Sequence, residues 1–87
     1  MKLKYECSVR EIAGEVVLVP LGEAALKLSG LITTNEVGAF LIENLREDTT
    51  QERLVQAVCE DFDIAPETAA ADVDSFLARL REFDILE

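Results

Sequence analysis

The stretch LKLSGLITTNEVGAFL, residues 26–41, decides the fold, because two different periodicities meet within it. Apolar side chains first alternate with polar ones, as in a β-strand, and later recur at the spacing of three to four residues that is typical of a helix. At the junction, Thr33 and Glu36 fit the capping-box pattern that marks a helix N-terminus. The stretch therefore predicts a strand over residues 26–33 that leads directly into a helix over residues 35–46.

Two further strands are predicted upstream. Residues 3–12 alternate apolar and polar side chains, which places one face on a core and the other in water. Residues 15–20 are apolar on both faces, as expected of a strand in the middle of its sheet. Ala13-Gly14 offers a tight turn between the two strands. The three strands predict an antiparallel meander whose third strand lies at an edge, with one row of backbone groups unpaired.

Two further helices are predicted downstream, over residues 50–62 and 66–83. Thr49 and Glu52 form a second capping-box pattern, and Pro66 suits the first turn of the last helix. The sequence therefore predicts a single α+β domain over residues 1–87. Its element order is βββααα, an arrangement like that of the winged helix-turn-helix.

Two local features refine this prediction. Gly38 lies inside the first predicted helix, where glycine costs up to about 1 kcal/mol relative to alanine, so a close packing contact is expected there. Near the end of the chain, Ile85 and Leu86 are apolar and follow the last helix, so they are expected to fold back onto the core.

Composition excludes several classes of function. The 87 residues include 18 acidic residues, 8 basic residues and no histidine, for a net charge of −10, and 49% of the residues are hydrophobic. The absence of histidine removes the commonest general base and the commonest metal ligand, so neither catalysis nor a metal or other cofactor is predicted. A negative surface opposes binding to nucleic acid and to anionic membranes. The charge is uneven, because residues 43–87 hold thirteen acids and four bases whereas residues 1–42 hold five acids and four bases.

The remaining sequence signals favour a cytoplasmic protein. Cys7 and Cys59 lie 52 positions apart and form no metal-binding spacing, so both are expected to be reduced thiols. No signal peptide is visible at the N-terminus, and the longest apolar run is far too short to span a bilayer. The acidic run at residues 60–63 lacks the glycine and the terminal glutamate of a calcium-binding loop.

Three interpretations remain open at this stage. The predicted edge strand, flanked by the apolar stripe of the last helix, suits an extended peptide that adds as a further strand, although the edge could also be blunted or pair in a dimer. A winged-helix DNA-binding module is an alternative, opposed by the acidic character of the last two helices. Asp74-Ser75-Phe76 resembles the Asp-Ser-Leu attachment site of acyl carrier proteins, which makes Ser75 a candidate site of a small carrier.

The sequence as a whole resembles the PqqD family. The likeness rests on Gly22-Glu23-Ala24-Ala25, on the run from Gly30 to Leu41, on Asp72-Val73-Asp74-Ser75-Phe76-Leu77-Ala78-Arg79-Leu80 and on the final Ile85-Leu86-Glu87. The order and spacing of these motifs cover about residues 5–87. One departure is Thr34, which stands where leucine commonly precedes the asparagine and which could itself cap the first helix.

This resemblance implies a peptide-recognition function. Proteins of this family bind the leader of a ribosomally synthesised precursor peptide and deliver its core to a maturase, often a radical S-adenosylmethionine enzyme with a SPASM domain. In that family the leader adds to the third strand and lies against the third helix. The matching positions here are Leu28, Ser29, Gly30, Leu31, Ile32 and Thr33 on the strand, and Ala69, Asp72, Val73, Phe76 and Leu80 on the helix.

Some of these helix positions have a second interpretation. Val73, Phe76 and Leu80 either line the groove or belong only to the core, and for Val73 and Leu80 the core interpretation is at least as good. Asp72 either meets a basic side chain of the leader or is a solvated helix acid. The charge distribution further predicts that a leader with Lys or Arg near the third helix is attracted, whereas a leader rich in acids is disfavoured.

Overall fold

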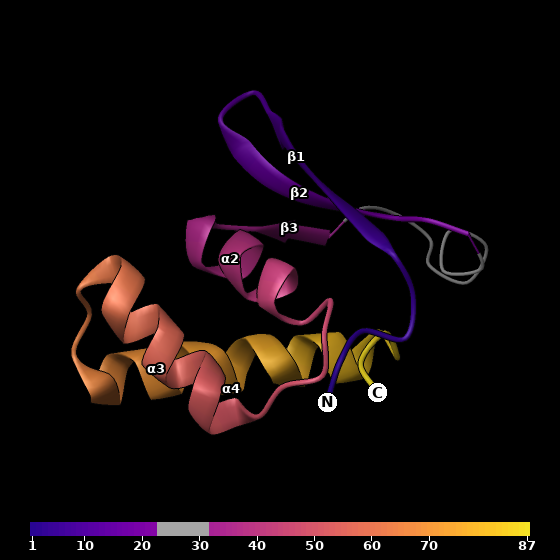
Figure 1. Ribbon diagram of the computed structural model, residues 1–87. Helices are drawn as coiled ribbons and strands as arrows, with labels where there is room; N and C mark the ends of the chain where they lie inside the picture. The colour runs from indigo at the N-terminus through magenta and orange to yellow at the C-terminus, as the bar shows by residue number, and fades with distance from the viewer. Residues whose placement is uncertain (23–31) are drawn as a thin grey trace.

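The computed structural model describes residues 1–22 and 32–87 of the chain (Figure 1). Strands β1 (Cys7–Ile12), β2 (Glu15–Pro20) and β3 (Ile32–Thr34) form an antiparallel sheet in the order β1-β2-β3. The predicted meander is therefore confirmed, with β2 in its centre. Val17 and Leu18 on β2 are both buried, as the apolar character of both its faces predicts.

Three helices follow the sheet: α2 (Glu36–Asn44), α3 (Gln51–Phe62) and α4 (Pro66–Glu82). Helix α2 lies between the sheet and the paired helices α3 and α4 (Figure 1). This arrangement confirms the α+β fold with the element order βββααα. None of the helices in the described part of the chain is long and apolar enough to cross a membrane.

The first strand begins at Cys7 rather than at residue 3, because the segment before it pairs with the other end of the chain. Leu3 forms an isolated antiparallel bridge with Leu86, and the Lys4 amide donates to the carbonyl of Ile85 at 2.9 Å. Ile85 and Leu86 are 1% and 5% exposed, which confirms that they fold back onto the core. The termini consequently lie close together (Figure 1).

The helix boundaries differ from the predicted ones by at most two residues, and the caps differ in identity. Asn35 caps α2, because its Oδ1 accepts from the amide of Gly38 at 2.9 Å. Thr33 and Thr34 lie before this cap, because both belong to β3, which ends one residue later than predicted. At the start of α3 the cap is Thr50 rather than Thr49. The observed helices end at residues 44, 62 and 82, whereas residues 46, 62 and 83 were predicted. The predicted strand residues 26–31 lie outside the described residues.

One continuous core joins the sheet to the helices. It includes Leu18 and Ile32 from the strands, Leu41 from α2, Leu54 from α3 and Leu77 from α4, each at most 4% exposed. Because these side chains come from every layer, the core fixes the position of α4 relative to the edge of the sheet.

The predicted close contact at Gly38 is confirmed. A Cβ atom at this position would overlap Oγ1 of Thr34 and would lie 2.9 Å from Cβ of Thr34 and 3.0 Å from Cε1 of Phe76. The missing side chain therefore allows the end of β3, the start of α2 and the middle of α4 to meet.

Candidate functional site

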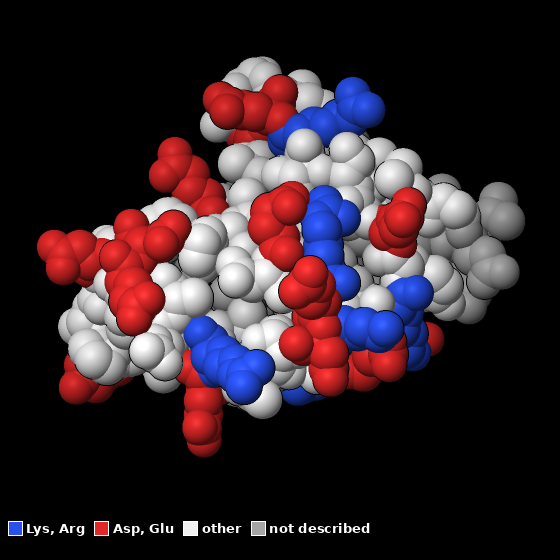
Figure 2. Space-filling model, viewed as in Figure 1, with Lys and Arg blue, Asp and Glu red and all other residues white. Residues whose placement is uncertain are grey.

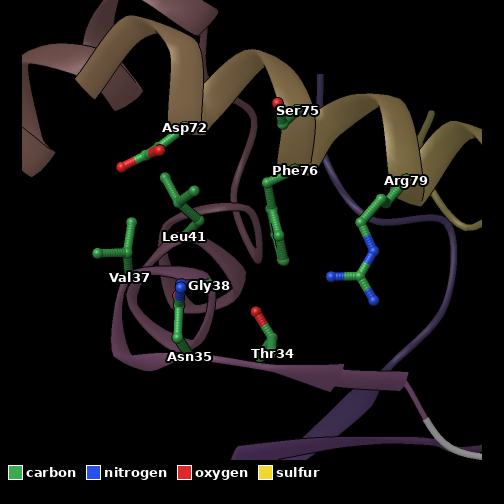
Figure 3. Close-up of a pocket in the computed structure, with 9 residues that line it drawn as sticks. All are labelled: Thr34, Asn35, Val37, Gly38, Leu41, Asp72, Ser75, Phe76 and Arg79. Atoms are coloured by element: carbon green, nitrogen blue, oxygen red, sulfur yellow. The ribbon is translucent and has the colours of Figure 1, made fainter. Parts of the chain in front are cut away.

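A pocket of about 170 Å³ opens where β3 runs into α2, on the side that faces α4 (Figure 3). Its lining comes from three elements that are distant in sequence. Those residues are Thr34, Asn35, Val37, Gly38, Leu41, Asp72, Ser75, Phe76 and Arg79. The pocket therefore lies beside the terminal strand of the sheet, which is where a peptide that adds to β3 would run.

Helix α4 supplies one face of this pocket, because the helical repeat brings positions separated by three, four and seven residues onto one side. Asp72, Phe76 and Arg79 follow this spacing, and Phe76 points between the other two toward Gly38 and Thr34 (Figure 3). Seven residues of helix span about 10 Å. The α4 side of the pocket therefore carries a negative charge at one end, a positive charge at the other and an aromatic ring between them.

The floor of the pocket is apolar and well packed. Phe76 is only 7% exposed, Leu41 is fully buried and Val37 is half-buried. Polar side chains form the rim, and among them Asp72 and Arg79 are exposed. An apolar floor with a polar rim suits a side chain that contributes apolar area while its backbone stays within hydrogen-bond reach of the strand.

The backbone of β3 is accessible from this side. In the described sheet β3 has β2 as its neighbour on one side and no strand on the other. The guanidinium Nη2 of Arg79 donates to the carbonyl of Thr33 at 3.0 Å, across the space between α4 and the strand. At the opposite edge of the sheet, Nη2 of Arg46 donates a hydrogen bond to the backbone carbonyl of Cys7 on β1 at 2.9 Å.

Arg46 belongs to a fixed arrangement on α2 and the loop after it. It bonds both carboxylate oxygens of Glu43 at 3.1 Å. These bonds lower the pKa of Glu43, and the Glu43 carboxylate raises the pKa of Arg46. Burial raises the pKa of the nearby Cys7 thiol, with Arg46 opposing the shift. A second pocket, of about 230 Å³, adjoins this arrangement at Leu3, Lys4, Tyr5, Glu6 and Arg46.

The charges are distributed unevenly over the surface. Acidic side chains gather on the end of the viewed face where α3 lies, whereas acidic and basic side chains are mixed over its middle (Figure 2). Within residues 1–22 and 32–87, no group of three or more acidic or cysteine side chains is placed to hold a metal ion.

The structure separates the site residues predicted from the sequence into three groups. Asp72 and Phe76 line the pocket, and Thr33 is exposed on the adjacent strand. Ile32, which is 4% exposed, turns its side chain into the core, and because the Thr33 carbonyl faces the open edge, the backbone groups of Ile32 face β2 instead. The helix residues without exposed surface are Ala69, Val73 and Leu80, which pack behind the pocket as core residues. Leu28, Ser29, Gly30 and Leu31 lie outside the described residues.

Sequence reasoning did not assign the other pocket residues, namely Thr34, Asn35, Val37, Gly38, Leu41, Ser75 and Arg79. For Ser75 and Arg79 a signal was available, because they lie three and seven positions after Asp72 and so share its helix face. For the α2 residues no local signal exists, since their place in the pocket depends on how α2 packs against α4.

Comparison with known proteins bears on this geometry. No curated protein matches the chain. A solved structure described as "TbiB1 in Complex with the TbiA(beta) Leader Peptide" is similar to it with a TM-score of 0.71 and 26% sequence identity, over 100% of this chain and 95% of the other. The profile of the family described as "Coenzyme PQQ synthesis protein D (PqqD)" matches residues 15–86. This chain belongs to the PqqD family.

Proposed function

We propose that this protein binds the leader segment of a ribosomally synthesised precursor peptide by strand addition to β3, in the groove between β3 and α4. The single observation that carries the proposal is the open edge of β3 beside a pocket lined by α4. The proposal draws further support from the family and from the similarity to TbiB1, a protein solved with a leader peptide.

The groove offers the two kinds of contact that strand addition requires. Backbone groups of β3 supply hydrogen bonds that do not depend on the peptide sequence, and the pocket supplies selectivity for alternate side chains. Thr34 at the end of β3 and the ring of Phe76 on α4 both line the pocket. An apolar leader side chain that enters this pocket would bury its surface against Phe76 and Val37.

Ordering an extended peptide costs conformational entropy, which the new hydrogen bonds and the buried apolar area must offset. Once the leader is held, the attached core peptide meets the modifying enzyme at a raised effective concentration. In this proposal the protein acts as a cytoplasmic adaptor without catalytic activity of its own. Its enzyme partner is a radical S-adenosylmethionine maturase of the SPASM type.

A titration followed by nuclear magnetic resonance tests the binding site. The probe is the leader of a short precursor peptide, which we expect to be encoded beside the gene for this protein, with a scrambled leader as control. The expected result is that amide signals of residues 32–34 and of α4 from residue 69 to residue 80 move with the leader and not with the scrambled peptide. Movement confined to Cys7–Ile12 would place the peptide on the other edge, and movement confined to residues 43–62 would contradict the groove entirely.

A pair of substitutions on α4 tests the pocket itself. Ser75→Tyr places a ring in the pocket and is expected to weaken leader binding by about tenfold or more, which corresponds to a loss of about 1.4 kcal/mol. Ala78→Tyr is the matched control, because Ala78 is exposed on the same helix and does not line the pocket. Equal affinities of the two variants would contradict a leader seated over the pocket.

A further inference from the structure

Both edges of the sheet carry an arginine on a backbone carbonyl, but the two arginines differ in what holds them. Arg46 donates to Cys7 O on β1, and Arg79 donates to Thr33 O on β3. Arg46 is also bonded to both carboxylate oxygens of Glu43, one helical turn away. Within residues 1–22 and 32–87, no carboxylate oxygen lies within 4.0 Å of the Arg79 guanidinium.

The bond that Arg79 makes bears directly on strand addition. In an antiparallel ladder, alternate residues direct both their N–H and C=O groups toward the same neighbouring strand. The Thr33 carbonyl, which accepts from Arg79 across the groove, is therefore one of the acceptors that a strand added to β3 needs. A peptide amide can use this carbonyl fully only when the guanidinium moves aside.

Displacement leaves the exposed guanidinium of Arg79 without its carbonyl acceptor. Arg79 carries its positive charge away from the Thr33 carbonyl when the guanidinium moves aside. A carboxylate is the group that pairs best with a displaced guanidinium, because two parallel N–H···O bonds can form. In this structure no carboxylate of the described residues contacts Arg79, so a peptide carboxylate would give the displaced guanidinium an ion pair that it lacks here.

We propose that Arg79 is a displaceable cap on the β3 edge, which selects leader peptides that carry an Asp or Glu opposite it. The inference rests on the proposed leader-binding function and adds the chemistry of one leader position. The anchored Arg46 would keep the β1 edge closed, so the pair of arginines also determines which edge accepts a peptide.

The face of α4 that carries Arg79 also carries Asp72, which predicts a charge preference at a second position of the leader. Asp72 lies about 10 Å from Arg79 along α4, which corresponds to about three residues of an extended peptide. The expected leader therefore carries an acidic side chain near Arg79 and a basic one near Asp72, about two to four positions apart. A single acidic position of this kind is compatible with the expectation that a leader rich in acids is repelled by the helical half of the protein.

Peptide selection tests the cap and does not require the natural leader. The probe is a displayed library of randomised peptides of about twelve residues, long enough to exceed the strand length of typical sheets. It is selected in parallel on the wild-type protein, on Arg79→Gln and on Arg46→Gln. Peptides that shift the amides of residues 32–34 are kept. We expect Asp or Glu to be enriched at one position for the wild-type protein and for Arg46→Gln, and the enrichment to be lost for Arg79→Gln.

A double-mutant cycle then measures the contact. In one selected peptide the enriched acid is replaced by its amide, and affinities are measured by fluorescence anisotropy for both proteins and both peptides. The expected coupling factor is about fivefold, the upper range for an exposed ion pair. Arg79→Lys, which keeps the charge but loses the two-pronged geometry, is expected to retain part of the coupling, and it replaces Arg79→Gln if that variant does not fold.

The outcomes distinguish this inference from the function on which it rests. Peptides that bind at β3 without acid enrichment, or a coupling factor close to one, would contradict the proposed role of Arg79. Neither result would contradict the proposed binding of a leader at β3. Enrichment that is lost for Arg46→Gln but kept for Arg79→Gln would also overturn the assignment. If no library peptide and no leader shifts β3 or α4, the proposed function fails, and the cap fails with it.

Discussion

At the scale of single residues, Gly38 makes the candidate site possible. Its amide bonds to the cap residue Asn35, and its missing side chain leaves room for Thr34 and for the ring of Phe76. Glycine inside a helix is unfavourable, so this contact has to compensate for a cost of up to about 1 kcal/mol. The same residue therefore links the end of β3, the start of α2 and the floor of the pocket.

Replacement of this glycine tests the close approach. Gly38→Ala is expected to lower the free energy of unfolding by roughly 1–2 kcal/mol, because overpacking costs about 1–3 kcal/mol while alanine recovers up to about 1 kcal/mol of helix propensity. Urea unfolding measures the change. Adding Thr34→Ala removes the oxygen that the new methyl group overlaps and should restore part of the stability. A more stable single variant would show that the elements do not approach this closely.

At the scale of elements, the helix N-termini show how strand pairing determines a cap. Hydroxyl residues occur in pairs before α2 and α3, at Thr33-Thr34 and Thr49-Thr50. Before α2 both threonines pair with β2, so the cap passes to Asn35. Before α3 the second threonine caps the helix, because Thr50 Oγ1 accepts from the amide of Arg53 at 3.2 Å.

The α3 cap gives a matched pair of substitutions. Thr50→Ala is expected to lower the free energy of unfolding by about 1 kcal/mol, since one amide of the first turn loses its acceptor. Thr49→Ala is the control, because its backbone groups bond to Met1 and its side chain does not cap the helix. Thermal unfolding monitored by circular dichroism compares them. A larger loss of stability for Thr49→Ala than for Thr50→Ala would contradict the Thr50 cap and support the predicted capping box of Thr49 and Glu52.

Helix α4 serves the core and the groove with different faces. Ala69, Val73 and Leu80 are fully buried, whereas Asp72 and Arg79 remain exposed at the ends of the pocket. Phe76 lies between the two faces, at 7% exposure. Substitution of a buried α4 residue would therefore alter binding through stability, and the exposed residues are the ones that test recognition.

At the scale of the whole molecule, the two ends of the chain close the fold. The bridge between Leu3 and Leu86 joins them, and so does the bond from the Glu87 amide to the Lys2 carbonyl at 2.8 Å. Ile85 is 1% exposed within the shared core. Ile85 and Leu86 thus belong to the same core that positions α4.

A substitution in this last segment measures its contribution. Ile85→Ala is expected to lower the free energy of unfolding by about 2–5 kcal/mol, a large fraction of the roughly 5–15 kcal/mol typical of a domain. Phe83→Ala is the control in the same segment, because that ring is 40% exposed, and it should cost about 1 kcal/mol or less. Urea unfolding distinguishes the two. Similar losses would contradict the burial of Ile85.

The sequence predicted the order of elements, the central strand and the class of function, because each depends on short-range patterns. Alternation over 15–20, the three- to four-residue spacing after Asn35 and the motifs of the family are all local properties of the chain. Cap identities were predicted only to within two residues, because several polar residues in a row can cap a helix and the local pattern does not show where the strand ends.

The tertiary structure alone decided how residues of β3, α2 and α4 come together in the pocket. The bond between Arg79 and Thr33 joins residues 46 positions apart, and no local periodicity relates a helix face to a strand edge at that distance. The division of α4 into core and groove residues has the same origin, since it depends on the angle at which the helix packs against the sheet. Local patterns therefore determine what each element is, and long-range packing determines what each element presents to a partner.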